Sequence, residues 1–400
     1  MRTLRAWYED RFVGDFVESD EGDVSFAYAV NPPLQLSLSL PFDKPIADGA
    51  PLRFLDNLLP GGAGTRRAMM MSMGAASTEP FDLLDRVDAA GGCVYSLSES
   101  CPTSAPAPLV PLTDDDLIAR IEAYAQLESP VIEPSTGMRF SLAGSQGKFS
   151  IAVIEGTRYL SGPAVPSTHI IKPEPRRLSG VARIESTTLD LAAACGLPVC
   201  DHGIIEGAVM PAFITARFDR ERAGTTECRR LHVEDFAQAS GLASGSKYDM
   251  TAEEAIALLN RADPSGKLAL DWLEQFAFNA YCGNADGHAK NYSLIYGADG
   301  IAMAPLYDAV MTSCWDTFDR GMGMSVNDEA FFPEYLDEVA WIGLARRSGL
   351  SAGRVLDRVR RIASDVIEKA PDVLIGLEAG ERDRALKGIS LATSGILKSS

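Results

Sequence analysis

The chain of 400 residues lacks the long apolar runs that mark membrane proteins. No stretch reaches the roughly 18 apolar residues that a membrane-spanning helix needs. The N-terminal segment MRTLRAWYEDRFVGDF alternates apolar with polar residues and carries acids, whereas a signal peptide has an unbroken apolar stretch. These absences argue against the membrane and secreted classes, so we expect a cytoplasmic protein that has no membrane partner.

Paired cysteines and an excess of basic charge are also missing. The seven cysteines are odd in number and form no CxxC motif, which argues against a disulfide framework or a zinc site, so we expect reduced, mostly buried thiols. Lysine and arginine number 37 against 55 acidic residues, which gives a net charge of −18. Because this charge repels phosphates, any contact with DNA would need a local basic patch or a partner protein.

The first hundred residues have the pattern of a separate, strand-rich module. Residues 24–30 and 34–40 alternate apolar with polar side chains, which predicts two half-buried strands. A helix is expected at PLRFLDNLL, residues 51–59. We therefore predict an N-terminal subdomain over residues 1–104.

A Pro-rich stretch, PTSAPAPLVPLTDDDL, follows this module and predicts a linker. Thr113 with Asp116 three residues later could cap a short helix whose apolar face carries Leu117 and Ile121. We assign residues 105–134 to this linker and its short helix.

The remaining chain divides into a strand-rich and a helical part. The segments MRFSLAG, KFSIAVI, RYLSG and THIIK predict strands within residues 135–220. From about residue 250 helices prevail: Thr251 and Glu254 form a capping box, and LALDWLEQFAFNAYC predicts a helix that Gly283 ends. The expected fold is therefore α+β, with a small β-rich lobe over 135–220 and a larger helical lobe over 221–400.

The loop NADGHAKN carries the most specific chemistry. Asp286 and Asn291 have the D-x-x-x-x-N spacing of a protein-kinase catalytic loop, and a predicted hairpin then returns the chain to Asp308. Phosphoryl transfer needs a carboxylate that accepts the proton of the attacking hydroxyl, and an amide and a second carboxylate that hold magnesium. We predict the first role for Asp286, the metal roles for Asn291 and Asp308, and a contact of Lys290 with the transferred phosphate.

Upstream residues supply the expected nucleotide contacts. Lys172 ends the strand THIIK and is predicted to fix the α and β phosphates, paired with Glu185 on the following helix. The loop Gly144-Ser145-Gln146-Gly147 could cover the phosphates with backbone N–H groups. The segment AFITARFDR, with Arg217 and Phe218, is predicted to be the strand and hinge where adenine meets backbone.

Plainer interpretations exist for each residue taken alone. Asn-Ala-Asp-Gly is a common turn, Asp308 could cap a helix, Lys172 could be a solvated strand end, and the glycine loop is a weak signal. We place His288 in the nucleotide-binding loop as a residue that orients it by hydrogen bonds, since no second histidine lies nearby to complete a metal site. The order of all these residues along the chain favours the kinase interpretation.

The segments FSLAGSQGK, THIIKPEP, RFDR, NADGHAKNYSLI and PLYDAV, in this order, resemble the HipA toxins, which are serine/threonine kinases of bacterial toxin–antitoxin modules. Segments of the first hundred residues, LSLSLP, FLDNLLP and PFDLL, resemble the N-terminal subdomain of that family. The resemblance implies a bilobal protein-kinase-like fold that binds ATP and Mg²⁺. It also implies that Asp286 is catalytic, that Asn291 and Asp308 bind metal, and that Lys172 binds the nucleotide.

The resemblance further implies a regulatory serine and several partners. Ser141 matches the serine that family members autophosphorylate to inactivate themselves, and Ser145 is a second candidate. The implied substrate is an aminoacyl-tRNA synthetase, most of all the glutamyl enzyme, whose phosphorylation arrests growth and promotes persistence. A HipB-like helix-turn-helix antitoxin would neutralise the kinase and bring the complex to operator DNA. Within that complex the kinase could form a homodimer. A small-molecule kinase and a non-catalytic nucleotide-binding corepressor stay open as alternatives.

Overall fold

The structure is a computed structural model that describes residues 1–103, 108–125, 147–162, 164–206, 209–223, 227–318, 320–327 and 331–397. These residues form two compact units. The first unit comprises residues 1–179, 201–245 and 295–298, and the second comprises 180–200, 246–294 and 299–400. Helices and antiparallel sheets are both present, which confirms the predicted α+β class. The predicted boundaries at residues 104, 134 and 220 stay predictions.

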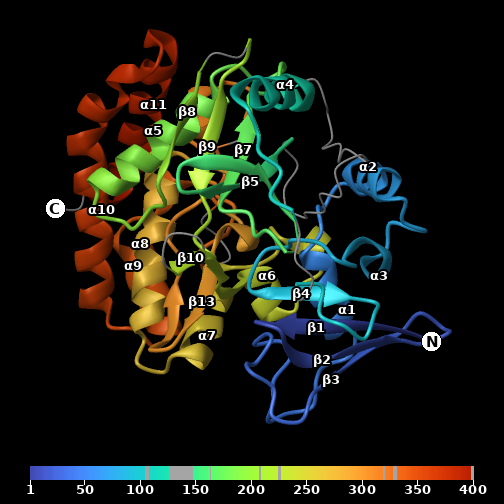
Figure 1. The fold of residues 1–400 in the computed structure, drawn as a ribbon. Coiled ribbons are helices and arrows are strands. Elements are labelled where there is room, and N and C mark those ends of the chain that lie inside the picture. Colours follow the sequence, from blue (N-terminus) through green and yellow to red (C-terminus); the bar gives the residue numbers. More distant parts are fainter. Residues whose placement is uncertain are drawn as a thin grey trace. The chain divides into compact units, whose positions relative to one another are not determined.

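The first unit carries most of the strands (Figure 1). Its elements are β1 (Arg2–Tyr8), β2 (Arg11–Glu18), β3 (Val24–Tyr28), α1 (Ala50–Asn57), α2 (Ala63–Met73), α3 (Pro80–Leu83), β4 (Cys93–Ser96), α4 (Asp114–Ala125), β5 (Phe149–Ile154), β6 (Thr157–Leu160), β7 (His169–Pro173), β8 (His202–Ile205), β9 (Ala212–Ala216), β10 (Arg220–Ala223), β11 (Glu227–Arg230), β12 (His232–Asp235) and α6 (Phe236–Ser240).

The N-terminal residues form an antiparallel sheet in the order β3-β2-β1-β4. The strand predicted over residues 24–30 is confirmed as β3, and the helix predicted over 51–59 as α1. Phe16 of the sheet stacks on Phe54 of α1, with ring centroids 6.2 Å apart. The strand predicted over residues 34–40 is wrong. Its backbone N–H groups bond to side chains instead of a neighbouring strand: that of Leu36 donates to the Tyr28 hydroxyl and that of Leu38 to the Glu234 carboxylate.

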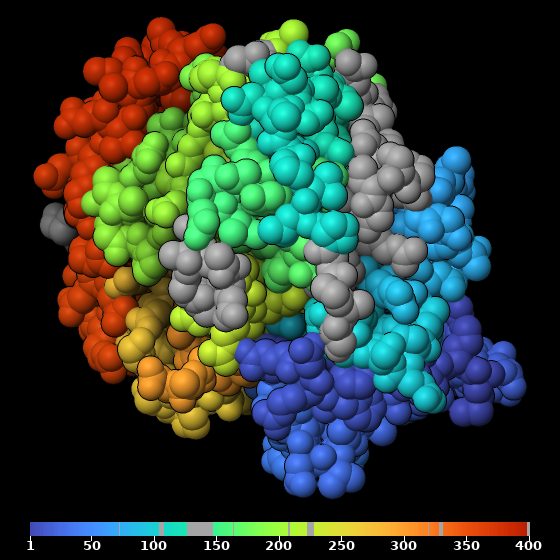
Figure 2. Space-filling view, in the orientation of Figure 1, coloured from blue at the N-terminus to red at the C-terminus, as the bar shows by residue number. Residues whose placement is uncertain are grey.

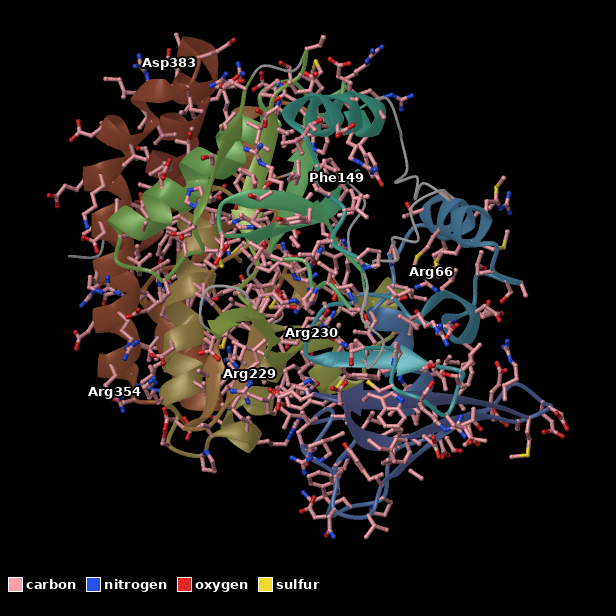
Figure 3. The ribbon with its side chains drawn as sticks, in the orientation of Figure 1. Arg66, Phe149, Arg229, Arg230, Arg354 and Asp383 are labelled. Atoms are coloured by element: carbon pink, nitrogen blue, oxygen red, sulfur yellow. The ribbon has the colours of Figure 1, made fainter. Side chains whose placement is uncertain are left out.

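A second sheet has the order β6-β5-β7-β9-β8. The helix α4 covers it, with Leu117, Ile121 and Tyr124 buried beside Phe149 of β5 (Figure 3). Reciprocal hydrogen bonds between Thr113 and Asp116 confirm the predicted capping box. The strand predicted at MRFSLAG, residues 138–144, lies outside the described residues.

The second unit is mainly helical. Its elements are α5 (Val181–Ala194), α7 (Ala252–Ala262), α8 (Lys267–Cys282), the short 3₁₀ helix η3 (Ala289–Asn291), β13 (Ser293–Gly297, shared with the first unit), β14 (Gly300–Met303), α9 (Glu338–Arg347), α10 (Ala352–Val373), α11 (Ala379–Ala392) and α12 (Ser394–Leu397). The helix α10 buries a stripe of Val355, Val359, Ile362 and Val366. The C-terminal helices appear as the red surface at the left of Figure 2. The capping box of Thr251 and Glu254 is confirmed.

Two general predictions can be compared with this structure. All seven cysteines are free thiols, five of them buried and Cys200 and Cys228 partly exposed, as expected. In the described part of the chain, no helix combines the length and apolar character needed to cross a membrane.

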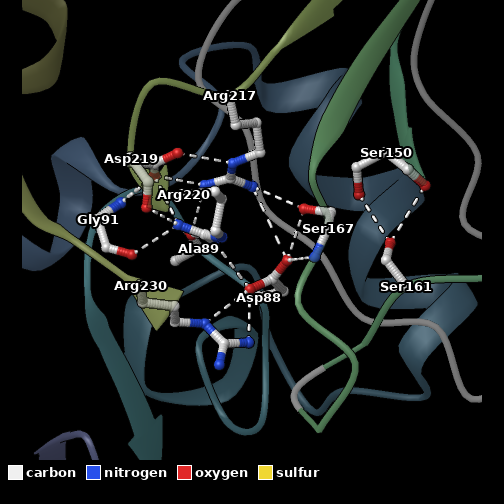
Figure 4. Close-up of polar contacts among 10 residues, drawn as sticks. All are labelled: Asp88, Ala89, Gly91, Ser150, Ser161, Ser167, Arg217, Asp219, Arg220 and Arg230. Carbon is white, nitrogen blue, oxygen red and sulfur yellow. Dashed lines mark hydrogen bonds and ion pairs between the residues drawn. The ribbon is translucent and has the colours of Figure 1, made fainter. Parts of the chain in front are cut away.

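A buried network of ion pairs organises the first unit (Figure 4). Asp88 is fully buried and lies 3.0 Å from the guanidinium group of Arg220, 2.9 Å from that of Arg230 and 3.8 Å from that of Arg217. The backbone N–H of Ser167 also donates to Asp88, at 3.0 Å. Three segments that are distant in the sequence, around residues 88, 167 and 217–230, therefore meet at one carboxylate.

The pKa of Asp88 reflects these neighbours. Burial alone would raise it, but the three guanidinium groups and the Ser167 hydroxyl hold the pKa well below the usual value of an aspartate. Asp219 behaves in the same way: burial opposes ionisation, but Arg217 and Arg220 lower its pKa to about 2. Both carboxylates are therefore charged at neutral pH, and the arginines depend on them as counter-charges.

We expect Asp88→Asn to lower the free energy of unfolding by about 3–5 kcal/mol, because it leaves buried guanidinium groups without a counter-charge. Urea denaturation followed by tryptophan fluorescence and circular dichroism measures the loss. Asp20→Asn is the matched control. Asp20 also forms an ion pair, but its side chain is 82% exposed, so this substitution should leave the urea midpoint almost unchanged. A midpoint for Asp88→Asn equal to that of the control would contradict the structural role of the network.

Candidate functional site

The loop that carries Asp286 is held by a buried amide network in the second unit. Helix α8 ends at Gly283, whose φ of 80° confirms the predicted left-handed end. Asn284 donates to the side chain of Asn279 at 2.8 Å and accepts the backbone N–H of Asp286 at 3.0 Å. Asn279 in turn donates to the buried Tyr292 hydroxyl at 3.0 Å. Hydrogen bonds therefore hold the start of the loop at Asn284, although Asp286 is exposed.

Asp286 itself lies at the surface, with its side chain 54% exposed. The Tyr248 hydroxyl donates a hydrogen bond to Oδ1 of Asp286, and Nε2 of His288 lies 3.7 Å from the same oxygen. An exposed carboxylate that is held from one side can receive a hydroxyl from the other. This geometry suits the predicted base.

His288 is buried beneath this carboxylate. Its Nδ1 lies 3.3 Å from the backbone N–H of Lys290 and its Nε2 lies 2.7 Å from Nζ of Lys247. Burial lowers the pKa of His288, and the charge of Lys247 lowers it further, against the opposing effects of Asp286 and Asp308. A neutral imidazole accepts a hydrogen bond at one ring nitrogen only, so it can use one of these two donors, whereas a protonated ring could use neither. The geometry is thus consistent with the predicted orienting role.

Asn291 and Asp308 meet at the base of the hairpin formed by β13 and β14. The Nδ2 group of Asn291 donates to the backbone oxygen of Asp308 at 3.0 Å, and the Tyr307 hydroxyl donates to the backbone oxygen of Lys290 at 2.8 Å. The hairpin therefore returns the chain to the loop, as expected. Asp308 has a φ of 54°, a left-handed conformation that is uncommon outside glycine and that occurs often at functional sites.

The amide oxygen of Asn291 fits a bound cation. It is buried and has no hydrogen-bond partner within the described part of the chain, while the other end of the amide is fixed on Asp308. A buried oxygen without a partner costs about 1–3 kcal/mol, so such an atom calls for a ligand. Amide and carboxylate oxygens suit Mg²⁺, which usually keeps several waters and needs few protein ligands. No group of three or more His, Cys, Asp and Glu side chains able to hold a metal occurs among the described residues.

The predicted nucleotide residues are distributed over both units. Lys172 lies on β7 in the first unit, where it is buried with Nζ 5.6 Å from the ring centre of Phe213. Glu185 is buried on α5 in the second unit, so the predicted pair of Lys172 with Glu185 stays a prediction. Gly147 precedes β5. Ser141, Gly144, Ser145 and Gln146 lie outside the described residues.

The predicted hinge segment follows β9 in the first unit. Phe218 is half-buried there, and the backbone N–H of Arg217 donates to the carbonyl of Thr168 at 2.8 Å. The side chain of Arg217 belongs to the buried ion network, where it donates to Asp219 at 2.8 and 2.6 Å. A nucleotide role for this segment therefore rests on its backbone.

Three residues that contact the loop escape sequence analysis. Lys247 and Tyr248 lie 38 or more residues before Asp286 in the chain, and no motif marks them. Gly323 packs against the loop so closely that an added Cβ would lie 2.6 Å from the backbone carbon of Gly287 and 2.8 Å from the backbone nitrogen of His288. A glycine in the sequence MGMS gives no local sign of this approach.

Comparisons with known proteins cover nearly the whole chain. The family model of the HipA-like C-terminal domain matches residues 140–374, and that of the HipA N-terminal domain matches residues 4–91. A putative kinase of Sinorhizobium fredii, Y4mE, is 31% identical over 94% of this chain and 92% of its own length. The serine/threonine-protein kinase toxin HipA of Shewanella oneidensis is 26% identical over 88% of this chain and 83% of its own.

A solved structure shares the fold. A chain in the complex of HipA, HipB and operator DNA from the Shewanella oneidensis toxin–antitoxin system superposes with a TM-score of 0.81 at 23% identity. The match covers 99% of this chain and 98% of that one. Both units described above are therefore parts of one known fold.

We expect Gly323→Ala to displace the loop around Asp286, because the added methyl group overlaps backbone atoms that have no free space. Hydrogen–deuterium exchange should show faster exchange in peptides that cover residues 284–292. Gly353→Ala is the matched control, since no atom lies within 4 Å of a Cβ added there. Unchanged exchange in Gly323→Ala would mean that the loop is not held from this side.

Proposed function

Since the chain belongs to the HipA family, we propose that it is an ATP- and Mg²⁺-dependent serine/threonine protein kinase and the toxin of a toxin–antitoxin module. The observation that carries this proposal is the loop geometry. The exposed Asp286 carboxylate lies on the same short loop as the amide oxygen of Asn291, which has no hydrogen-bond partner among the described residues. The Asn291 amide also donates to the backbone oxygen of Asp308, so the residue proposed as the second metal ligand adjoins Asn291.

In the proposed reaction Asp286 accepts the proton of a serine or threonine hydroxyl. The hydroxyl oxygen forms a bond to the γ-phosphorus of ATP, the bond from that phosphorus to the ADP oxygen breaks, and ADP leaves. Asn291 and Asp308 would hold Mg²⁺, which when bound offsets the negative charge of the phosphates. Lys290 would contact the transferred phosphate, and Lys172 with Glu185 would fix the remaining ones.

The proposed substrate is an aminoacyl-tRNA synthetase, with the glutamyl enzyme as the first candidate. Phosphorylation would stop charging and so inhibit translation and growth. Transfer to Ser141, or to Ser145, would add close to two negative charges beside the expected phosphate site and so inactivate the kinase. A HipB-like antitoxin is the proposed partner: the fold matches a chain solved with HipB and operator DNA, and the net charge of −18 leaves the DNA contacts to such a partner.

The test incubates the wild-type protein and Asp286→Asn with radiolabelled ATP, Mg²⁺ and a panel of purified aminoacyl-tRNA synthetases. We expect label on the glutamyl enzyme with the wild type and none with the variant. Label only on metabolites of a cell extract would favour a small-molecule kinase. No label on any molecule, together with growth arrest by both proteins, would favour a non-catalytic corepressor and overturn the proposal.

The two aspartates should differ in nucleotide binding. We expect Asp308→Ala to weaken Mg²⁺-dependent ATP binding by roughly tenfold or more, because a contact with a charged group contributes about 1.5–3 kcal/mol. Asp286→Ala should change the affinity little, since the base acts on the hydroxyl. Titration calorimetry with and without Mg²⁺ measures both, and equal losses would contradict the separate roles.

A further inference from the structure

We propose that Tyr248 is a positioning residue for Asp286: its hydroxyl holds one carboxylate oxygen so that the other faces the substrate hydroxyl. The inference rests on the proposed function, because it assigns Asp286 the role of base. Tyr248 is 51% exposed, so burial does not fix its side chain. Specific contacts with the loop must therefore do so.

The ring of Tyr248 is held between two groups of the second unit. Its edge meets the ring of His288, with centroids 4.9 Å apart and an interplanar angle of 83°. Nζ of Lys247 lies 4.8 Å from the centre of the Tyr248 ring and 2.7 Å from Nε2 of His288. These contacts aim the hydroxyl at Oδ1 of Asp286, to which it donates.

The backbone next to Tyr248 is fixed on the same loop. The carbonyl of Lys247 accepts the N–H of Ala289 at 3.1 Å, and the N–H of His288 donates to the carbonyl of Asp286 at 2.8 Å. Tyr248 and Asp286 are therefore joined both through their side chains and through a short backbone path. The hydrogen bond is part of one small rigid assembly.

The consequence for catalysis follows from the two carboxylate oxygens. Oδ1 of Asp286 accepts the hydrogen bond of the Tyr248 hydroxyl and lies 3.7 Å from Nε2 of His288, whereas Oδ2 makes no hydrogen bond within the described residues. Burial raises the pKa of Tyr248, and its hydrogen bond to Asp286 raises it further, so the phenol stays a donor at neutral pH and does not compete as a base. The substrate proton is thus directed to Oδ2.

The test compares Tyr248→Phe with the wild type in phosphate transfer. The substitution keeps the ring and its contacts with His288 and Lys247 but removes the hydroxyl. We expect kcat to fall about tenfold while the KM for ATP is unchanged, since misorientation of a base affects the chemical step. In the Asp286→Asn background the same substitution should cause no further loss. Tyr335→Phe is the control, because Tyr335 is 63% exposed and its hydroxyl has no hydrogen bond within the described residues.

Hydrogen–deuterium exchange of residues 284–292 gives a second readout that does not need activity. We expect Tyr248→Phe to leave exchange near the wild-type level and Tyr248→Ala, which also removes the ring, to increase it. A wild type that transfers no phosphate overturns the proposed function and with it the role of Asp286 as base. An active wild type with unchanged or increased kcat in Tyr248→Phe overturns the positioning role alone, and increased kcat would mark the hydroxyl as an inhibitor of the base.

Discussion

The buried carboxylate of Asp88 is the constraint on which the first unit depends. A single charge with no solvent contact is stable only because three guanidinium groups and the Ser167 N–H surround it. The requirement is mutual, since each arginine would be a costly buried cation without its acid. Residues of the N-terminal HipA domain and of the segment after β9 are thereby fixed against each other. The N-terminal domain is an integral part of this unit.

A second buried carboxylate in the same unit is stabilised in a different way. Glu234 accepts hydrogen bonds from the Ser37 hydroxyl, the Leu38 N–H and the Tyr296 hydroxyl, and no described residue forms an ion pair with it. Burial raises its pKa to about 7, although these donors act in the opposite direction. Its usual pKa in an unfolded chain is about 4.3. The folded state therefore binds this proton more tightly, and the stabilisation it contributes is lost as the pH rises through about 7.

Glu234 also explains the one clear failure of the sequence pattern. Leucines alternate with polar residues over 34–40, which predicts a strand. In the structure Leu36, Ser37 and Leu40 are buried while Leu38 is half-buried, and the side chains of Tyr28 and Glu234 accept backbone N–H groups in place of a neighbouring strand. Glu234 is 196 residues from Leu38 in the sequence, so no local pattern could reveal it. Features set by nearby residues, such as the Thr251–Glu254 cap and the turn at Gly283, were predictable for the opposite reason.

The same distinction between local and distant determinants applies to the candidate site. The spacing of Asp286, Asn291 and Asp308 can be read directly from the sequence. The hairpin that brings Asn291 and Asp308 together was also predictable from it. The orientation of each polar atom depends instead on residues that carry no motif: Asn279 holds the start of the loop, and Tyr248 contacts Asp286. Asp308 adds a left-handed backbone conformation, which is uncommon outside glycine although aspartate adopts it more readily than most residues. The strain at Asp308 and the Asn291 oxygen, which lacks a partner among the described residues, both lower the free energy of unfolding. A bound cation would raise it again. Metal binding and the rigidity of the loop are therefore expected to be coupled, because both act on the same few atoms.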